Sequence, residues 1–412
     1  MLELANISES ANLSKDVTHT DARKEPIHNW FPYLEGFSET FIENILNSLN
    51  EKPKVIYEPF SGSGTVPVYC KRNNIDCFYS EVNPFLIELT DLKLSIFDFS
   101  ENDKKSIHDN LLQISNDLNK ILDNTKQDKV LLKSYKNVFE RSIYFEPENF
   151  DKVLKLSTYC KQIEDVNISQ FVKIAICNSL LPSSLLKRAG DIRYRKGKEL
   201  DNIANIVDLV VKRLKIIAKD IVNLSEQKND IHFEYNYNSK IYDEKYESKV
   251  DVIVTSPPYL NGTNYIRNTK LELWFLGYLK VKKDLSGFRK EVVTSGINDV
   301  TTIEKEIELP AIDDILNNAE LWYDKRIPKM IKDYFFDMNI VISNFYKYLR
   351  KGGYVFLDIG DSVYAKKHIP TDLILLDLFK RNGFTVVDNL KLRDRRSKGG
   401  MIVKQCLLVL RK

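Results

Sequence analysis

The residue pattern with the most specific chemistry is Ser-Pro-Pro-Tyr, at positions 256–259, directly after the mostly apolar run Val250–Thr255. The run predicts a buried strand, so the tetrapeptide is expected at the carboxyl edge of a sheet, where open α/β sheets bind ligands. Two prolines fix the backbone and remove two N–H donors, which leaves carbonyl oxygens exposed on a rigid loop. The Ser256 hydroxyl and the Pro257 carbonyl can then accept the hydrogens of an exocyclic amino group on a flat ring, on which Tyr259 stacks. The competing interpretation is a proline-rich turn with a surface tyrosine.

A second motif, EPFSGSGT, occupies residues Glu58–Thr65, between a predicted strand and a predicted helix. Its glycines, Gly62 and Gly64, allow backbone N–H groups to approach a ligand at the positive end of that helix. Glu81 ends the next predicted strand, 19 residues after Gly62 (81 − 62), the spacing at which a carboxylate accepts the hydroxyls of an adenosine ribose. Asn83 follows, placed to flank the adenine ring. The third glycine of the dinucleotide fingerprint is missing, which disfavours a nicotinamide cofactor. The alternative is a glycine turn that binds nothing.

Together the two motifs resemble those of the amino-methyltransferases that use S-adenosylmethionine to methylate exocyclic amines of DNA bases. The family's glycine motif is D-P-F-x-G-S-G-T, with Glu58 here in place of Asp, and its catalytic motif is (D/N/S)-P-P-(Y/F). TSPPY is the version associated with the N4 amine of cytosine. Residues 28–38 resemble the motif that covers the methionine end of the cofactor, and residues 352–362 resemble a later strand. The resemblance covers residues 26–98 and 230–412.

This resemblance implies an α/β fold, a Rossmann-like class I methyltransferase sheet with a helical insertion. It implies S-adenosylmethionine as cofactor, bound by Trp30, Phe31, Glu58, Phe60, Gly62, Gly64, Thr65, Glu81 and Asn83. The implied catalytic residues are Ser256, Pro257, Pro258 and Tyr259. Their acceptors would draw the amino hydrogens out of plane, so that the localised lone pair attacks the methyl group in line. The base would be flipped out of the duplex against the tyrosine ring, whose hydroxyl is expected to matter little. No metal is expected.

Four functions remain open at this stage. The leading one is methylation of cytosine N4 in double-stranded DNA, in a restriction-modification or related system with a cognate restriction endonuclease as a partner. Adenine N6 methylation needs the same loop and a differently shaped pocket. RNA or protein amine methylation is the third, and an inactive DNA-binding module is the fourth, disfavoured by the intact SPPY motif. The expected location is the cytoplasm of a bacterial, archaeal or phage-infected cell, away from membranes.

Contact with DNA phosphates is expected from two basic stretches, residues 187–198 and 391–398. The residues assigned to DNA are Lys187, Arg188, Arg193, Arg195, Lys196, Arg395 and Arg396. The competing interpretation of each stretch is a solvated charged face. Recognition of the target DNA sequence is expected either from segment 280–326, which is long and mixed in composition, or from the helical insert.

The periodicity of apolar residues predicts the strands and helices that must position these residues. A strand at Lys54–Tyr57, the glycine turn, a helix at 66–71 and a strand at Ile75–Ser80 open a parallel doubly wound sheet. A helical insert is predicted over 99–229, which divides a catalytic domain of residues 26–98 and 230–412. Later strands are predicted at Ile231–Tyr235, Val250–Thr255, Tyr354–Ile359, Thr385–Asp388 and Gln405–Leu410, with helices at Phe41–Leu49, Ile331–Leu349 and Thr371–Arg381.

Composition bounds these predictions without deciding between them. The chain has 412 residues, 43% apolar and 29% charged, with a net charge of +3, which is typical of an ordinary globular protein. The five cysteines show no CxxC spacing, which predicts reduced thiols and disfavours a zinc site. The first 25 residues are polar and are expected to form a loose arm. Their start shows no secretory signal, and no apolar run reaches membrane-span length.

Overall fold

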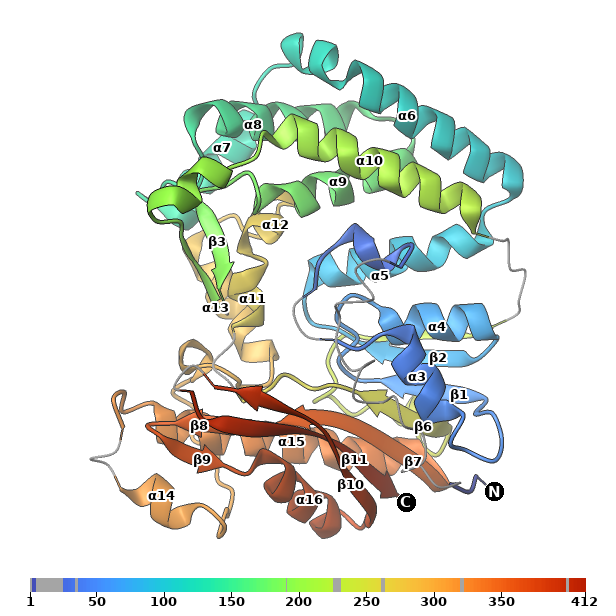
Figure 1. The fold of residues 1–412 in the computed structure, drawn as a ribbon, viewed down its shortest axis with the longest axis vertical. Helices are drawn as coiled ribbons and strands as arrows, with labels where there is room; N and C mark the ends of the chain where they lie inside the picture. Colours follow the sequence, from blue (N-terminus) through green and yellow to red (C-terminus); the bar gives the residue numbers. More distant parts are fainter. Residues whose placement is uncertain are drawn as a thin grey trace.

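A twisted sheet lies at the centre of the computed structural model (Figure 1). The structure describes residues 2–4, 25–33, 36–189, 191–224, 231–260, 264–318, 322–397 and 400–412. Within them the sheet has seven strands, in the order β10-β11-β7-β6-β1-β2-β5. The strands are β1 (Val55–Glu58), β2 (Asp76–Ser80), β5 (Phe233–Asn236), β6 (Val250–Thr255), β7 (Leu349–Gly360), β10 (Thr385–Arg396) and β11 (Ile402–Arg411).

Five strands, β5, β2, β1, β6 and β7, run parallel, and β11 is antiparallel to both β7 and β10. The chain moves from β1 outward through β2 to β5, then returns to the other side of β1 with β6. The order therefore reverses between β1 and β6, which creates a crevice at their carboxyl ends where such sheets bind ligands. This topology confirms the predicted Rossmann-like class I methyltransferase sheet.

Helices cover both faces of the sheet because its strands bury side chains alternately on two sides. In β6, Val252 and Val254 belong to one apolar core, and Ile253 belongs to the other. The first core packs against α3 (Glu39–Leu46), α4 (Thr65–Asn73) and α5 (Pro84–Ser95). The second packs against α15 (Ile327–Tyr348) and α16 (Thr371–Arg381). The result is a three-layer α/β/α arrangement.

The segment between β2 and β5 is helical, as predicted, and lies beyond α5 at one end of the molecule (Figure 1). Its helices are α6 (Glu101–Asp123), α7 (Lys129–Phe139), α8 (Pro147–Gln162), α9 (Val166–Leu180) and α10 (Ile206–Asn223). One part differs from the prediction, because β3 (Leu186–Ala189) and β4 (Asp191–Tyr194) form an antiparallel hairpin inside the basic stretch. Each strand has four residues, too few for a period to show. The division into domains stays a prediction.

Short elements follow the Ser-Pro-Pro-Tyr motif. They are α11 (Tyr265–Asn268), α12 (Lys270–Phe275), α13 (Lys282–Glu291) and α14 (Asp313–Asn317), with a second small sheet of β8 (Ser362–Tyr364) and β9 (Lys367–Ile369). Short 3-10 helices occur at η2 (His28–Trp30), η3 (Ile96–Asp98), η4 (Gly197–Asn202), η5 (Glu244–Tyr246) and η6 (Ile297–Asp299). Most of the predicted N-terminal arm lies outside the described residues. The five cysteines are buried free thiols, and no helix in the described ranges is long and apolar enough to cross a membrane.

Candidate active site

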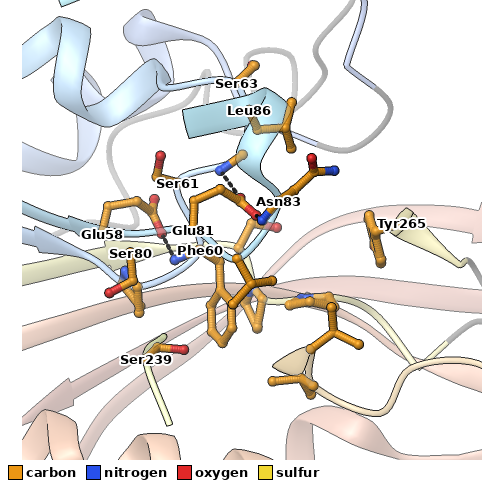
Figure 2. Close-up of a pocket in the computed structure, with 18 of the residues that line it drawn as sticks. Glu58, Phe60, Ser61, Ser63, Ser80, Glu81, Asn83, Leu86, Ser239 and Tyr265 are labelled. Carbon is orange, nitrogen blue, oxygen red and sulfur yellow. Dashed lines mark hydrogen bonds between the residues drawn. The ribbon is translucent and has the colours of Figure 1, made fainter. Parts of the chain in front are cut away.

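A single pocket receives residues from both motifs at the carboxyl ends of β1, β2 and β6 (Figure 2). It encloses about 1050 Å³ of space, including the part open to solvent. Its lining comprises residues 33, 36–37, 58–63, 65–66, 80–83, 86, 237–239, 256–258, 264–266, 291–293, 295 and 299. The sheet therefore brings the glycine turn, Glu81 and the start of SPPY to one space, as their positions after three strands predict.

Left-handed backbone at both glycines shapes the turn between β1 and α4. Gly62 has φ +53° and Gly64 has φ +83°, a region that side chains rarely tolerate. A Cβ on Gly64 would lie 2.7 Å from the Thr90 Oγ1 of α5, so glycine is required for the close approach of the two segments. A Cβ on Gly62 would likewise meet the Tyr33 ring at 2.9 Å. The turn thus leads tightly into the first residue of α4, Thr65, whose helix N-terminus faces the pocket.

Two acids lie beside this turn, the buried Glu58 and the partly buried Glu81. The Glu81 carboxylate accepts hydrogen bonds from the backbone N–H of Gly62, at 2.9 Å, and of Asn83, at 2.8 Å. Glu58 accepts from the N–H of Phe60, at 2.9 Å, and from the Thr255 hydroxyl, at 2.6 Å. Burial raises the pKa of Glu81 to about 7 and that of Glu58 to about 8. Since Thr255 precedes SPPY, Glu58 connects the glycine turn to the SPPY loop.

The pocket residues fit a nucleoside cofactor with an amino-acid tail. The Ser61 hydroxyl is buried, lines the pocket and has no hydrogen-bond partner among the described residues. An orphaned buried hydroxyl costs free energy that a bound polar group would recover. Glu81 keeps lone pairs beyond the two that the backbone uses, because an ionised carboxylate has about four acceptor sites. These residues would hold the tail near Ser61 and the ribose near Glu81.

We expect binding of S-adenosylmethionine to strengthen as the pH rises through about 7, where Glu81 ionises. The raised pKa means that the carboxyl is protonated below this pH, and a neutral carboxyl accepts ribose hydroxyls and attracts a sulfonium cation less well. Glu81→Gln should flatten this pH dependence, and Glu81→Ala should weaken binding by about 1.5–3 kcal/mol. Calorimetric titration between pH 6 and 8 (roughly one unit on either side of that value) measures both. A wild-type affinity that does not change with pH would contradict the assignment of Glu81.

Three of the residues predicted to bind the cofactor, Trp30, Phe31 and Gly64, do not line the pocket. Trp30 is 1% exposed, and its Nε1 donates to the Asp220 Oδ2 of α10 at 2.9 Å. Phe31 is 2% exposed and packs edge-on against Phe85 at 4.7 Å between ring centroids. Both are core residues of this structure, and the residues of the same stretch that line the pocket are Tyr33, Gly36 and Phe37. Gly64 also lies just outside the lining, whereas the other predicted cofactor residues belong to it.

The start of SPPY reaches the pocket, but its tyrosine turns away. Ser256, Pro257 and Pro258 line the pocket, whereas Tyr259 is 5% exposed and does not. Its hydroxyl donates to Asp358 Oδ2 at 2.7 Å and accepts from Gln405 Nε2 at 2.9 Å. The Arg395 guanidinium lies over the ring, 4.9 Å from its centroid. The hydroxyl is therefore engaged in a buried network, and its small role in activity stays a prediction.

Asp358, on β7, is the centre of that network. It accepts from the Tyr259 hydroxyl, from Gln405 Nε2 at 2.8 Å and from the Ser256 hydroxyl at 3.2 Å. Burial raises the pKa of Asp358, and these three hydrogen bonds and Arg395 oppose that effect. Three donors converging on one carboxyl match its ionised form. When the Ser256 hydroxyl donates to Asp358, the two lone pairs of its oxygen are left to accept hydrogen bonds at the pocket wall.

Relatives of known class extend over nearly the whole chain. The chain is 24% identical to the Type II methyltransferase M.AvaI of Nostoc sp., over 97% of this chain and 90% of that protein. It is 22% identical to the Type II methyltransferase M.BsoBI of Geobacillus stearothermophilus, over 93% and 83% of the two chains. Its homologues are Type II DNA methyltransferases. This confirms the resemblance to the amino-methyltransferase group, and methyltransferases of this type use S-adenosylmethionine as methyl donor.

No protein-family model matches the chain. Among solved structures, an rRNA methyltransferase, aviRa from Streptomyces viridochromogenes, aligns with a TM-score of 0.31 and 8% identity, over 97% of this chain and 92% of that one.

The residues predicted to contact DNA fall into two groups in the structure. Lys187 and Arg193 are exposed on the hairpin and share an ion pair with Glu199, and Lys196 and Arg396 are also exposed. By contrast, Arg195 donates to the backbone carbonyls of Pro182, Ser184, Leu186 and Glu199. Arg188 donates to the Pro32 carbonyl, and Arg395 lies on Tyr259. Arg195 is therefore mainly structural, and Lys398 of the second stretch lies outside the described residues.

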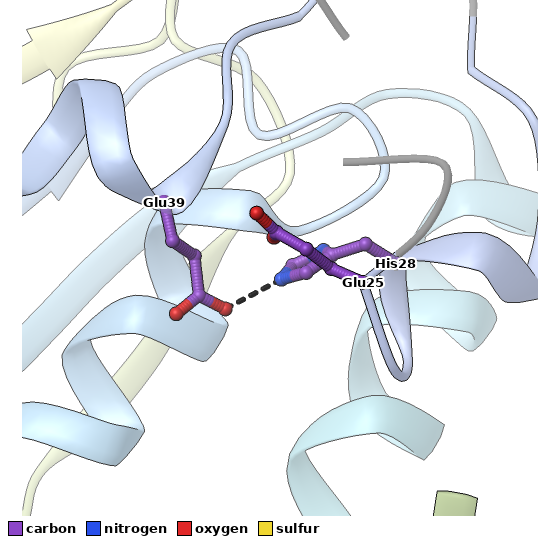
Figure 3. A group of neighbouring side chains, drawn as sticks. All are labelled: Glu25, His28 and Glu39. Carbon is purple, nitrogen blue, oxygen red and sulfur yellow. Dashed lines mark hydrogen bonds and ion pairs between the residues drawn. The ribbon is translucent and has the colours of Figure 1, made fainter. Parts of the chain in front are cut away.

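A compact polar cluster lies at the segment of residues 25–39, before the glycine turn. Atoms of Glu25, His28 and Glu39 approach within 4.8 Å of one another, and Glu39 Oε1 meets His28 Nε2 at 2.5 Å (Figure 3). Arg72 Nη1 also donates to Glu39, at 2.8 Å, which neutralises this carboxylate. Burial lowers the pKa of His28, and the positive charges of Lys93 and Arg72 act in the same direction. We interpret the cluster as a structural ion pair that holds the segment before the pocket.

Proposed function

We propose that this protein is an S-adenosylmethionine-dependent DNA methyltransferase that acts on the exocyclic N4 amine of cytosine, in a restriction-modification system. The observation that carries the proposal is one pocket lined both by the glycine turn with Glu81 and by Ser256 and Pro257. A nucleoside methyl donor and an amine substrate would thus meet at neighbouring strand ends. The Type II methyltransferase relatives support DNA as the substrate.

The chemistry required of the protein is mainly positioning. S-adenosylmethionine, when bound, supplies an activated methyl group. The Ser256 oxygen and the Pro257 carbonyl accept the two amino hydrogens and localise the nitrogen lone pair toward that methyl group. The negative charge of Asp358, relayed through the Ser256 hydroxyl, stabilises the positive charge that develops on the amine. A target base must leave the duplex to reach a pocket of this kind.

Adenine N6 methylation is the second candidate, because the same acceptors serve either amine. TSPPY favours cytosine N4 by resemblance. Nucleoside mass spectrometry of digested DNA from expressing cells distinguishes them: N4-methylcytosine is expected, and its amount should be strongly reduced in cells that express Ser256→Ala. Finding N6-methyladenine would show that adenine N6, and not cytosine N4, is the methylated amine. Unmodified DNA together with methylated RNA would overturn the proposal.

DNA phosphate contact is proposed for the exposed face of the hairpin region. Replacing Arg193 and Lys196 with glutamine should weaken binding to all duplexes alike, and the slope of log K against log salt should fall by about 1 per lost phosphate contact. Arg195 is kept, since its loss would disturb the fold. The matched control replaces Lys380 and Arg381 of α16, on the opposite side of the sheet. A double variant with the wild-type slope would mean that the stretch is a solvated face.

A further inference from the structure

The β3–β4 hairpin touches the two segments that border the pocket on its two sides. It extends from the helical insert toward α11 and α13 (Figure 1). On β3, Arg188 Nη1 donates to the Pro32 carbonyl at 3.1 Å, next to the pocket residue Tyr33. On β4, Asp191 Oδ2 pairs with Arg267 Nη1 of α11 at 2.8 Å. The hairpin thus contacts both the segment over the glycine turn and the helix after SPPY.

Helix α11 is itself connected to the pocket, through residues that line it and through hydrogen bonds. Its residues Tyr265 and Ile266, and its N-cap Asn264, line the pocket. The Asn264 side chain accepts from the Arg267 N–H at 2.7 Å, so the residue that pairs with the hairpin is hydrogen-bonded to a pocket residue. The Tyr265 hydroxyl also accepts from the Tyr259 N–H at 3.4 Å. A displacement of α11 would therefore reach the SPPY loop.

The same hairpin carries exposed basic residues, Lys187 and Arg193, on strands that pair directly with each other. We propose that the hairpin is a positioning element that couples DNA contact to the pocket, with the Asp191–Arg267 ion pair as its link to the catalytic side. This rests on the proposed function. Coupling between two binding sites is reciprocal, so DNA should strengthen cofactor binding by the factor by which cofactor strengthens DNA binding.

The ion pair is suited to this role because it is weak in itself. Its side chains are 40% and 31% exposed for Arg267 and Asp191, and exposed pairs add little to global stability. Its removal should leave the fold intact while loosening the contact between hairpin and α11. The structure thus allows coupling to be tested separately from folding.

The test measures S-adenosylmethionine affinity by calorimetry, with and without a mixed-sequence DNA duplex, in the full-length protein. The wild type should bind the cofactor about fivefold or more tightly with the duplex present, the lower end of common couplings. In Asp191→Asn this enhancement should disappear, while the affinity without DNA stays within about twofold of the wild type, well inside that coupling range. The charge swap Asp191→Arg with Arg267→Asp should restore the enhancement. Asp377→Asn, which breaks an exposed ion pair with Arg381 on α16, is the matched control.

An Asp191→Asn protein that keeps the full enhancement, or a charge swap that fails to restore it in a folded protein, would overturn the proposal. A wild type with no enhancement would overturn it as well. None of these outcomes affects the proposed function, which fails only if the wild type transfers no methyl group to DNA.

Discussion

Ser256→Ala is expected to lower the single-turnover rate of methyl transfer about 100-fold, the loss typical of removing one preorganised hydrogen-bond partner of a reacting group. The serine oxygen can accept a hydrogen of the amine while its own proton is donated to Asp358. Alanine removes both the acceptor and the relay of negative charge. Affinity for DNA and for cofactor should change little, because the interaction is made most strongly in the transition state.

Asp358→Asn tests the effect of the negative charge of Asp358 separately from the effect of the Ser256 oxygen as hydrogen-bond acceptor. It keeps a hydroxyl at residue 256 but removes the negative charge, so the rate should fall less than in Ser256→Ala. The matched control is Ser115→Ala, since the Ser115 hydroxyl is buried and donates within α6, to the Leu111 carbonyl. Rapid-quench measurements at saturating cofactor and DNA give the rates. Wild-type turnover in folded Ser256→Ala would show that the loop is no catalytic site.

The parallel core of the fold could be predicted because its signals are local. The strand Val250–Thr255 has the predicted bounds, and the glycine turn lies between β1 and α4 as its composition requires. The carboxyl ends of parallel strands meet at one edge, so placing Glu81 and Ser256 after two such strands predicts that they share a pocket. No knowledge of distant pairing was needed.

The Asp358 network depends on pairing that spacing does not reveal. Antiparallel pairing sets Gln405 opposite Gly360 and Leu407 opposite Asp358, which brings the Gln405 side chain diagonally against Asp358. The one available signal is an acid within the apolar run of residues 354–359. A buried charge in a central strand requires hydrogen-bond partners, so an acid in this run indicates a polar network around it.

Runs of basic residues predict the exposed, DNA-contacting side chains poorly, for a related reason. Arg195 and Lys196 are neighbours in one basic stretch, yet Arg195 is bound to backbone carbonyls while Lys196 is exposed. Which arginine faces solvent depends on the hairpin and on the turn after it, and the sequence predicted only helix there. In the same way, Trp30 is held by Asp220, from a helix that follows it by 190 residues.

Tyr259→Phe is expected to destabilise the protein by about 1–3 kcal/mol, the cost of leaving buried hydrogen-bond groups unpaired. The lost hydroxyl donates to Asp358 and accepts from Gln405. Turnover should fall as well, because Asp358 loses a donor that fixes it beside Ser256. Urea denaturation measures the first effect and single-turnover kinetics the second. Tyr364→Phe is the control, since its buried hydroxyl has no hydrogen-bond partner among the described residues.

Comparison with Tyr259→Ala separates the two roles considered for this ring. If the tyrosine stacks on a flipped base, phenylalanine should keep most of the activity and alanine should lose about 1–3 kcal/mol of binding to the transition state. If it acts through the network, the two variants should lose turnover alike. Arg395 covers the ring in this structure, so a stacked base would have to displace that guanidinium. We therefore expect the network result, and an active, stable Tyr259→Phe protein would instead favour stacking.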